Sequence, residues 1–504
     1  MIGRQSLLIL AVRLLTSFLG FVGLFLITNL LGPEVYGSIA FTLSLLAAFN
    51  AVADLGFNSA HIKKVSEGQD LKDCLATFAM IKMFLIGLLV AVTILSVFAY
   101  FAIMGMVFSP ESIELITLFT LYYVLYNLSS IVTTTYYGML KIAKAQLMIL
   151  ADVGVRIPLI AIVAFAGGDT VSLAFAYVAA GISVVITAFL LLMRDGIRWG
   201  RPTLYKSYAR FALPLALVVI VGTASANVDK ILIGYFHSPV SVAFYSSSQS
   251  FLSVVALVGV SVSTITFPSF SKWHARGEVE AIRRVTLAAE RYITMFGLPI
   301  TALLFLFPTE IAVALFGPRF TEAGGPMRWL SLATFLNLAN AVHASQINAV
   351  NRPDIDAKLT FLNFLIFVPL LLITVPNDLL GMPMLGLSYT GAAISLLIST
   401  SVVFMATRLV VLGLTGTSSN PCILYQLLAM FASSVLLILI SNLMPITNWV
   451  ILLLYVAMAM GSFSVVLYAL GELRADDIRY ILDMLNPHKL VRYSIDEVKA
   501  RPKG

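Results

Sequence analysis

The sequence predicts an all-α polytopic membrane protein with about 14 transmembrane helices. Its 504 residues are 60% hydrophobic and only 11% charged, whereas an ordinary soluble protein carries about 25% charged residues. The apolar residues form successive blocks of roughly 20 to 28, each long enough to cross a hydrocarbon layer of about 30 Å. This composition excludes soluble enzymes and nucleic-acid-binding proteins, although the net charge of +7 alone would suggest a nucleic-acid partner.

The helix boundaries follow from turn residues between the apolar blocks. Gly32–Pro33, Ser109–Pro110, Gly167–Gly168 and Asn420–Pro421 separate neighbouring blocks, as these residue types do in turns. We expect membrane helices at residues 6–31, 35–60, 75–103, 113–140, 145–168, 170–194, 208–236, 240–267, 284–307, 325–350, 354–375, 384–412, 422–443 and 446–470. The outer loops are then short, and the longest, around 308–324, has room for one small helix.

The basic residues predict the orientation in the membrane. With the N-terminus inside, 25 of the 32 Lys and Arg residues fall in cytoplasmic segments, and the outer segments receive only Arg319 and Arg328. Because short cytoplasmic loops retain Lys and Arg, we expect a multi-pass protein of the cell membrane with both termini in the cytoplasm. The helix at 6–31 is too long for a signal-peptide core, so we expect it to be retained.

The cysteines and histidines predict neither a disulfide nor a metal centre. Cys74 and Cys422 are too few and too far apart for a disulfide framework. Neither belongs to a Cys/His cluster, and His343 has no neighbour at the spacing of metal ligands. We therefore expect two inert thiols, no metal site and no cofactor.

A weak internal repeat predicts two lobes. Two segments share the pattern: Leu-Gly-Pro-Glu-Val-Tyr-Gly-Ser-Ile-Ala at 31–40 and His-Ser-Pro-Val-Ser-Val-Ala-Phe-Tyr-Ser at 237–246. Pro33 thereby matches Pro239, and Gly37 matches Ala243. Each segment joins the first two helices of a set of six. Because six is an even number, both sets start on the same side of the membrane, so the repeats are parallel and related by an axis along the membrane normal. The alternative is two unrelated proline turns.

The predicted organisation is a transporter-like pair of lobes with appended segments. Its parts are an N-terminal lobe at 1–194 (helices 1–6), a cytoplasmic interlobe linker at 195–207, a C-terminal lobe at 208–412 (helices 7–12), helices 13 and 14 at 413–470, and a cytoplasmic amphipathic tail at 471–504. In the tail, Ile478, Ile481, Leu482 and Leu485 follow helical spacing, and we expect this stripe to lie on the membrane surface or on the cytoplasmic loops.

Six segments carry a family resemblance. They are Leu31-Gly32-Pro33-Glu34-Val35-Tyr36-Gly37, Asp54-Leu55-Gly56, Ala212-Leu213-Pro214, Val228-Asp229-Lys230-Ile231-Leu232-Ile233-Gly234-Tyr235-Phe236, Phe267-Pro268-Ser269-Phe270-Ser271-Lys272 and Ala314-Leu315-Phe316-Gly317-Pro318-Arg319-Phe320. In this order the chain resembles the polysaccharide-transporter (O-antigen-type flippase) family of the multidrug/oligosaccharidyl-lipid/polysaccharide exporter superfamily. The resemblance implies fourteen helices, two lobes around a central cavity, and movement of polyprenyl-linked oligosaccharide from the cytoplasmic to the outer leaflet. It implies no catalytic motif.

Ionisable side chains inside the apolar blocks are candidate functional residues. The basic ones are Arg13, Lys82, Arg156, Lys230 and Arg291, and the acidic ones are Asp54, Asp152, Asp229 and Glu290. A charge at the centre of a lipid-facing helix costs roughly 2.5 to 3.5 kcal/mol on insertion scales. We therefore expect these groups to face protein or a hydrated cavity.

Four of the cations are predicted to bind the phosphate or pyrophosphate that joins lipid to sugar. Arg13, Lys82 and Arg291 lie about 10 Å from the cytoplasmic end of their helices, where the alternative is that they reach the lipid headgroups. Arg156 lies deeper, and Asp152 precedes it by four residues, so the alternative is a local ion pair. Arginine offers a bidentate fork to phosphate oxygens, and lysine offers a point charge.

The remaining intramembrane charges are candidates for ion coupling or helix pairing. Asp229 is a candidate for proton or sodium coupling, with a structural bond to another helix as the alternative. Because consecutive residues point about 100° apart on a helix, we do not expect Asp229 to pair with Lys230. Asp54 and Glu290 lie near the cytoplasmic boundary and are expected in contacts at helix ends or between lobes.

Polar residues on two helices are candidates for contacts with sugar hydroxyls. They are Asn337 and Asn340 on the tenth predicted helix and Gln249 on the eighth. Small polar residues also join membrane helices to each other, and this is the alternative. Pro214, Pro299 and Pro369 interrupt the hydrogen bonding of their helices, so bending during transport can concentrate there; fixed kinks would give the same sequence.

Together these features predict a flippase that works by alternating access, with no enzymatic activity. Its partners are lipid-linked oligosaccharide, membrane lipids and, in the cell, glycan-assembly glycosyltransferases or a polymerase; we expect a monomer that binds no nucleic acid. One alternative is a multidrug or small-cation antiporter of the same superfamily, which would need an acidic cavity. A second is a membrane glycosyltransferase or polymerase, against which the short outer loops argue.

Overall fold

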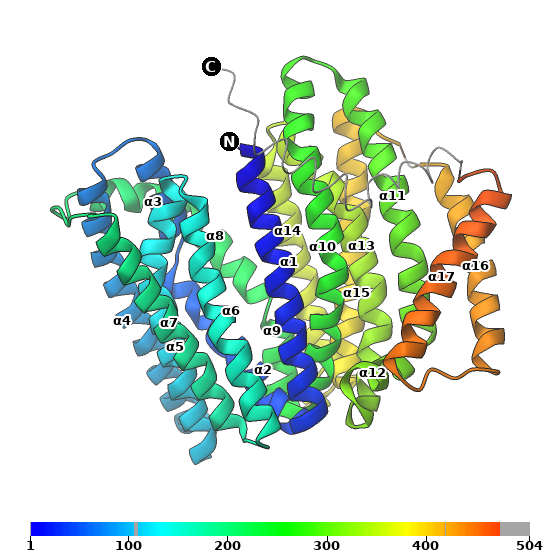
Figure 1. Cartoon of the computed structure of the whole chain (residues 1–504), viewed down its shortest axis with the longest axis horizontal. Coiled ribbons are helices and arrows are strands. Elements are labelled where there is room, and N and C mark those ends of the chain that lie inside the picture. The colour runs from blue at the N-terminus through cyan, green and yellow to red at the C-terminus, as the bar shows by residue number, and fades with distance from the viewer. Residues whose placement is uncertain (1, 105–108, 419, 474–504) are drawn as a thin grey trace. The chain divides into compact units, whose positions relative to one another are not determined.

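The computed structural model describes residues 2–104, 109–418 and 420–473, and almost all of them are helical (Figure 1). The first ten helices are α1 (Ile2–Leu26), α2 (Pro33–Asn50), α3 (Phe57–Ser66), α4 (Leu71–Met104), α5 (Pro110–Gly138), α6 (Ile142–Phe165), α7 (Thr170–Arg194), α8 (Tyr205–Ser225), α9 (Val228–Phe236) and α10 (Pro239–Ala275). The others are α11 (Val279–Leu306), α12 (Pro308–Phe316), α13 (Gly324–Ala349), α14 (Pro353–Thr374), α15 (Ser388–Thr415), α16 (Cys422–Ser441) and α17 (Trp449–Ala469).

Short elements occupy several of the connections. They are η1 (Ile27–Leu31), η2 (Ala51–Ala53), η3 (Pro318–Ala323) and an antiparallel hairpin of β1 (Asp378–Leu379) and β2 (Met382–Pro383), with Asp378 opposite Pro383. The long predicted outer loop holds α12 and η3, so the expected small helix is confirmed. The hairpin was not predicted. The predicted stripe of the tail lies outside the described residues.

The predicted fold class is confirmed. Within the described residues, 13 helices are long and apolar enough to cross a membrane, and the protein is a multi-pass membrane protein. α13 has 26 residues and is also long enough, but polar residues such as Asn337, His343 and Gln346 lower its hydropathy. Since α13 occupies the predicted position 325–350, every one of the fourteen predicted positions holds a long helix.

The predicted helix at 35–60 is wrong at its C-terminal end. The chain leaves the helix after Asn50, passes through η2, and turns at Leu55 and Gly56, whose φ angles are 45° and 80°. Left-handed backbone cannot continue a right-handed helix, and glycine adopts it without a steric penalty. α3 starts immediately afterwards as a separate short helix. Hydropathy does not detect this break because both sides of it are apolar.

The predicted helix at 208–236 is also divided. α8 ends at Ser225, and Asn227, with φ −134°, separates it from α9. The Asn227 side-chain amide donates to the carbonyl oxygen of Thr223 (2.9 Å), a local bond that competes with helix continuation. The membrane segment therefore consists of a 21-residue helix followed by a 9-residue helix.

The contacts of the chain group into two compact units. The N-terminal unit comprises residues 11–247 and 364–392, and the C-terminal unit comprises, among the described residues, 2–10, 248–363 and 393–473. In the N-terminal unit, apolar residues of α2, α5, α6 and α7 form one core that includes Leu46, Phe119 and Leu173. In the C-terminal unit, α11 and α13 form a core around Ile293 and Leu338.

The two repeat segments of the sequence pack against each other within the N-terminal unit. A Cβ atom placed on Gly37 of α2 would lie 1.9 Å from the carbonyl oxygen of Pro239 and 3.2 Å from Cβ of Ala243. The segments that match in sequence, 31–40 and 237–246, therefore meet where α2 crosses the start of α10. Only glycine allows so close an approach of the two backbones.

The segment 195–204, which connects α7 to α8, is hydrogen-bonded to other parts of the N-terminal unit. The backbone N–H of Gly200 donates to the carbonyl oxygen of Lys72 (3.1 Å), and that of Arg201 donates to Asp73 Oδ1 (2.8 Å). Asp195 accepts from Lys144 and from Lys141, and these bonds, the one from Lys144 first, hold the pKa of Asp195 below its ordinary value. The connection between α7 and α8 therefore lies against the start of α4 and the α5–α6 turn.

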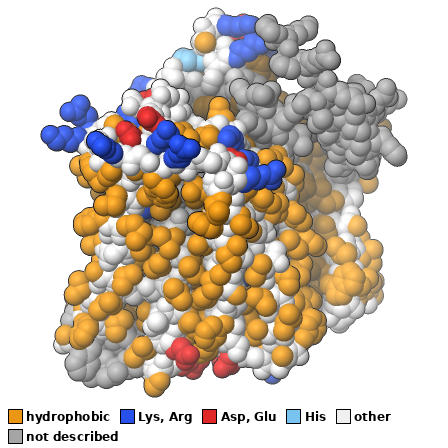
Figure 2. All heavy atoms as spheres, turned by 60° about the vertical axis from the view of Figure 1, so that its left-hand side comes forward, with side chains coloured by type: hydrophobic (Ala, Val, Ile, Leu, Met, Phe, Trp, Pro, Cys, Tyr) orange, Lys and Arg blue, Asp and Glu red, His pale blue; other side chains and the backbone are white. Residues whose placement is uncertain are grey.

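Charged residues gather at the two ends of the N-terminal helices. On the face shown in Figure 2, hydrophobic side chains form a belt; Lys and Arg, with some Asp and Glu among them, lie along the upper edge, and Asp and Glu lie at the lower edge. Glu34, Glu111 and Asp169 lie at the starts of α2, α5 and α7, where acidic groups stabilise a helix N-terminus. The bonds from Ser172 to Asp169 lower the pKa of that carboxyl.

The close approach at Gly37 yields a stability prediction. Gly37→Ala should destabilise the protein by about 1 to 3 kcal/mol or more, because the added methyl collides with the Pro239 carbonyl and the backbones have to separate. Thermal unfolding of the purified protein in detergent measures the effect. Gly87→Ala is the matched control, since nothing lies within 4 Å of the Cβ position in α4. Equal stability of the two variants would contradict the packing.

Candidate functional site

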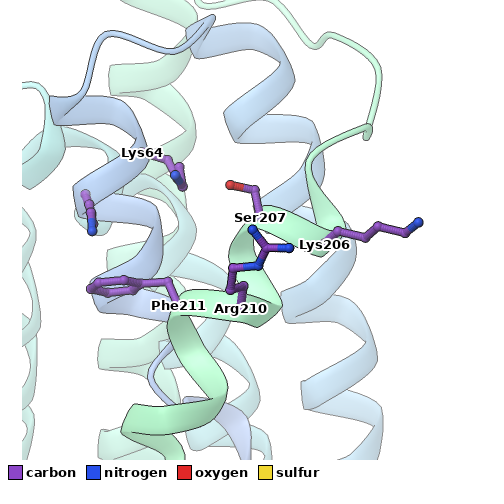
Figure 3. A pocket seen from close by; sticks show the side chains of 6 residues that line it. Lys64, Lys206, Ser207, Arg210 and Phe211 are labelled. Atoms are coloured by element: carbon purple, nitrogen blue, oxygen red, sulfur yellow. The ribbon is translucent and has the colours of Figure 1, made fainter.

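A basic pocket lies between α3 and α8 in the N-terminal unit (Figure 3). It has a volume of about 450 Å³. Figure 3 shows Lys64 of α3 facing Ser207 and Arg210 of α8 across the pocket. The complete lining is Lys63, Lys64, Lys206, Ser207, Arg210 and Phe211. Four of these six side chains are cations.

The break between α2 and α3 and the start of α8 bring these cations together. Lys63 and Lys64 lie in the last turn of α3, and Lys206 and Arg210 are four residues apart at the beginning of α8. Gly56 allows the start of α3 to approach α8, since its Cβ position lies 3.0 Å from the Ala212 carbonyl oxygen. The pocket forms because the C-terminal end of α3 lies beside the N-terminal end of α8, although the two helices are far apart in sequence.

A buried histidine fastens α3 to α8. His61 is fully buried; its Nδ1 lies 2.8 Å from the Tyr208 hydroxyl and its Nε2 lies 2.8 Å from Thr135 Oγ1. Thr135 donates its own proton to the Ile131 carbonyl (2.7 Å), so Nε2–H donates to Thr135. Burial lowers the pKa of His61 to about 3 and so favours the neutral ring, in which Nδ1 is an acceptor for the Tyr208 hydroxyl.

The pocket carries excess positive charge. Lys64 lies 3.0 Å from Glu67 and Lys63 lies 3.8 Å from it, and the bond from Lys64 is the main cause that lowers the pKa of Glu67. Within the described part of the chain, Lys206 and Arg210 form no ion pair. Lys63 Nζ also lies 4.3 Å from the centre of the Phe211 ring. Glu67 thus pairs with only two of the four cations.

This arrangement suits a phosphate or pyrophosphate group. Arg210 can bind two oxygens with its planar fork, the lysines supply point charges, and Ser207 supplies a hydroxyl donor. The Phe211 ring gives the pocket one apolar wall beside the membrane-spanning part of α8. An amphiphile with a phosphate head and an apolar tail matches both parts of this surface.

Lys82, predicted to bind phosphate, lies in a buried network on α4. It is 0% exposed, and its Nζ donates to the Ala53 carbonyl oxygen (2.8 Å) and to Asn127 Oδ1 (3.2 Å). Asn127 in turn donates to Asn50 Oδ1 (2.6 Å). Lys82 therefore does not reach the lipid headgroups; it satisfies a carbonyl left free where α2 ends.

Arg156 and Asp152 form a local ion pair, which was the alternative to the predicted phosphate binding. Arg156 Nη2 lies 2.7 Å from Asp152 Oδ2, and the two side chains are 21% and 19% exposed. The guanidinium also lies over the ring of Tyr177, 5.2 Å from its centre, and Tyr122 packs edge-on against Tyr177. The pair is thus partly accessible and has aromatic walls.

The other two predicted phosphate ligands differ from each other. Arg13 is exposed on α1 and forms no ion pair with any described residue. Arg291 of α11 binds Glu472, with Nε 2.8 Å from Oε1 and Nη2 donating to the Glu472 carbonyl oxygen (2.6 Å). Gln426 of α16 also donates to Glu472 Oε1 (3.3 Å). In the C-terminal unit, Arg291 therefore holds α16 and the end of α17 against α11. Neither residue lines the basic pocket.

The acidic candidates have protein partners. Asp54 Oδ1 accepts from the backbone N–H of Asn58 (3.1 Å) in the first turn of α3. Asp229 is buried and accepts from the Tyr245 hydroxyl (2.8 Å). The expectation that Asp229 and Lys230 do not pair is wrong: Lys230 Nζ lies 4.0 Å from Asp229 Oδ1. The helix break is the reason, because Lys230 lies in the first turn of α9 and reaches back to the free Ala226 carbonyl oxygen (3.0 Å).

Glu290 belongs to a buried cluster that the sequence pattern does not reveal. Its Oε1 lies 2.6 Å from Arg408 Nη1 and 3.1 Å from His343 Nε2. Among the proposed sugar contacts, Asn337 is exposed, while Asn340 and Gln249 are half-buried. Asn340 Oδ1 is buried and has no hydrogen-bond partner among the described residues.

Sequence reasoning missed the lining of the basic pocket and the residues that support it. Lys63, Lys64, Lys206 and Arg210 contribute to the positive charge that predicts orientation, but without the break at Gly56 nothing indicates that they meet. His61 and Tyr208 are 147 positions apart. The sequence does show two pairs of cations beside apolar segments: Lys63 and Lys64 are adjacent, and Lys206 and Arg210 are four residues apart.

The family follows from comparison with known sequences. A model of the family described as polysaccharide biosynthesis proteins matches residues 2–274. The chain belongs to this family. The matched region includes the whole basic pocket, and the resemblance noted in the sequence is confirmed.

Individual relatives are distant. The chain is 21% identical over 375 residues to the probable low-salt glycan biosynthesis flippase Agl15 of Haloferax volcanii, covering 72% of this chain and 75% of the relative. It is 24% identical over 255 residues to the probable flippase AglR of the same organism, covering 50% and 52%. An uncharacterized membrane protein of Methanocaldococcus jannaschii is 24% identical over 151 residues, covering 29% and 30%. The last two matches span about half and less than a third of those relatives.

Solved structures share the fold. Lipid II flippase MurJ in an inward closed conformation has a TM-score of 0.72 at 14% identity, covering 91% of this chain and 98% of that one. An inward-facing multidrug resistance MATE family transporter of the MOP superfamily has a TM-score of 0.62 at 18% identity, covering 80% and 96%. The chain therefore shares its fold with these two transporters.

The neutral His61 predicts a loss of stability in acid. The pKa of His61 in the folded protein is about 3, below the unfolded value of about 6.5, so its contribution is complete above pH 6.5 and declines as the pH falls towards 3. Between pH 7.5 and 5 the protein should lose roughly 2 kcal/mol through this group. His61→Gln, which cannot titrate, should show a smaller loss in thermal unfolding at the two pH values. Identical losses in both proteins would contradict the assignment.

The pair of Arg291 and Glu472 predicts a second stability effect. Arg291→Met leaves the Glu472 carboxylate, 3% exposed, without its cation, and breaking a buried pair costs about 3 to 5 kcal/mol. Adding Glu472→Met should recover most of that loss, because no charge remains buried. Denaturant unfolding of the single and double variants measures both steps. A single variant as stable as the unchanged protein would show that the pair contributes nothing.

Proposed function

We propose that this protein is a flippase that moves polyprenyl-(pyro)phosphate-linked oligosaccharide from the cytoplasmic to the outer leaflet by alternating access, for surface polysaccharide or glycoprotein glycan assembly. The observation that carries the proposal is the basic pocket between α3 and α8, inside the region that matches the polysaccharide biosynthesis family. Two relatives named as probable flippases and the fold shared with a lipid II flippase support it.

The chemistry of the substrate explains the features of the pocket. A sugar-phosphate head cannot cross hydrocarbon alone, because an unpaired charge and unsatisfied hydroxyls are costly there. The cations of the pocket would capture the phosphate groups at the membrane boundary, while the polyprenyl tail remains in the bilayer. The protein would then transport the head without making or breaking a covalent bond.

Further polar groups of the N-terminal unit would act after capture. Arg156 is partly exposed and held by Asp152, so a phosphate oxygen can compete for its guanidinium. The exposed Arg13 would offer a further cation. The aromatic faces of Tyr122 and Tyr177 beside Arg156 would provide walls for the sugar rings. Lys82 of the N-terminal unit and Arg291 of the C-terminal unit would instead hold helices together during transport.

The cellular setting follows from the same proposal. We place the protein in the cell membrane as a monomer with both termini in the cytoplasm, because retained Lys and Arg residues mark the cytoplasmic side. The basic pocket would then open where lipid-linked oligosaccharide is assembled. Membrane lipids surround the protein, and the glycosyltransferases or polymerase of glycan assembly would act before and after it.

Charge reversal in the pocket tests the function. Lys206→Glu with Arg210→Glu should reduce flipping at least tenfold, because carboxylates would repel the phosphate. Flipping is measured in proteoliposomes as the accessibility of a fluorescent polyprenyl-diphosphate-linked disaccharide to an external quencher. Arg198→Glu, an exposed base outside the pocket lining, is the matched control and should flip normally. Normal flipping by the double variant would refute the role of the pocket, and ethidium extrusion by the unchanged protein would favour a drug antiporter.

A further inference from the structure

Three polar side chains meet inside the C-terminal unit at a place remote in sequence from the basic pocket. Glu290 of α11 is 5% exposed, His343 of α13 is 0% exposed, and the side chain of Arg408 of α15 is 16% exposed. Arg408 Nη1 lies 2.6 Å from Glu290 Oε1 and 2.9 Å from His343 Nε2. His343 Nε2 lies 3.1 Å from the same Glu290 oxygen. Three atoms from three helices thus form a closed triangle.

His343 Nε2 cannot form both hydrogen bonds of the triangle at the same time. Towards Arg408, a permanent donor, Nε2 has to be an acceptor; towards the Glu290 carboxylate, Nε2 has to carry a proton and donate. One nitrogen cannot do both. In the neutral ring with its proton on Nδ1, His343 bonds to Arg408 of α15. When a proton binds to Nε2 of that ring, His343 donates to the Glu290 carboxylate of α11 instead. A single proton therefore changes which helix α13 is bonded to.

Unsatisfied atoms next to the triangle show that neither arrangement is complete. His343 Nδ1 and Glu290 Oε2 are buried without a hydrogen-bond partner among the described residues, and so is Asn340 Oδ1, one turn before His343 on α13. Buried polar groups are usually hydrogen-bonded, so a buried atom without a partner needs an explanation. Here these atoms leave hydrogen-bonding capacity inside the cluster for a change in the protonation of His343.

The surrounding charges leave the titration to this cluster. On α11 the neighbouring Arg291 binds Glu472, and on α13 the other charged residue, Arg328, lies near the start of the helix. Arg408 is the charged residue of α15, while α16 and α17 have none. On α14, Asp354 pairs with Arg352, and Asp356 accepts from Asn348. On α10 the charged residues Lys272 and His274 lie in the last turn. With neutral His343 the cluster has no net charge, because Arg408 balances Glu290. With protonated His343 it has one positive charge, and the two cations share one carboxylate.

We propose that His343, with Glu290 and Arg408, is the proton-binding site that couples substrate movement to proton movement. This inference rests on the proposed flippase function. Binding of a proton moves the hydrogen bond of His343 from α15 to α11 and loosens the hold of Glu290 on Arg408, so α13 and α15 are released from each other. Loss of the proton restores their bond. The ligand is a proton and not sodium, because Arg408 already neutralises the only carboxylate of the cluster.

The first test follows proton binding without transport. The protein has five histidines, so selective isotope labelling of histidine in nanodiscs gives a simple spectrum in which His343→Gln identifies the His343 signals. Between pH 5 and 8.5 these signals should change, and Glu290→Gln should alter that change because the carboxylate that accepts from Nε2–H is lost. Arg408→Lys provides a second perturbation if Glu290→Gln does not fold. A His343 signal that stays constant over this range would overturn the proposal.

The second test follows coupling. In proteoliposomes with the fluorescent polyprenyl-diphosphate-linked disaccharide, an imposed pH gradient at constant sodium should change the flipping rate at least fivefold. His343→Gln should abolish this response, whereas His274→Gln, an exposed histidine at the end of α10, should retain it. A rate that responds to a sodium gradient alone, or a full pH response in His343→Gln, would overturn the proposal. No flipping under any gradient, with a normal titration of His343, would refute the flippase function and the coupling but leave the proton site established.

Discussion

Hydrocarbon offers no hydrogen-bond partner, so every polar group within the spans of this protein has to be satisfied by another part of the chain or by a hydrated surface. Lys82 bonds to a carbonyl freed at the end of α2, and Arg291 bonds to Glu472 beyond α17. His61 joins α3 to α8 in the same way. These bonds connect helices that apolar contacts with lipid could not hold in one arrangement.

The same constraint separates structural cations from accessible ones. A cation with backbone or carboxylate partners deep in the protein already has its charge balanced, and removing it from those partners would be costly. The basic pocket is different, because only two of its four cations pair with a carboxylate among the described residues, and all four lie at helix ends. Positive charge is thus concentrated at a boundary, where an amphiphilic anion can reach it from the membrane plane.

The two units use buried polar groups differently. In the N-terminal unit both ring nitrogens of the neutral His61 have a partner. In the C-terminal unit the two bonds of His343 Nε2 are mutually exclusive, and Nδ1 has no partner among the described residues. A consistent network rigidifies a junction, whereas a conflicting one allows two arrangements of similar energy. The first suits a scaffold for a binding pocket, and the second suits a switch.

Much of the fold could be predicted from the sequence, because the length and apolarity of each span are local properties. The sequence by itself determined the fourteen long helices, the turns at Gly32–Pro33 and Ser109–Pro110 and the family. Only the tertiary structure decided that Asp152 pairs with Arg156, that the predicted helices at 35–60 and 208–236 are interrupted, that Lys63 and Arg210 line one pocket, and that Glu290 meets Arg408. These contacts join residues far apart in the chain, and they depend on backbone turns and helix packing that hydropathy does not record.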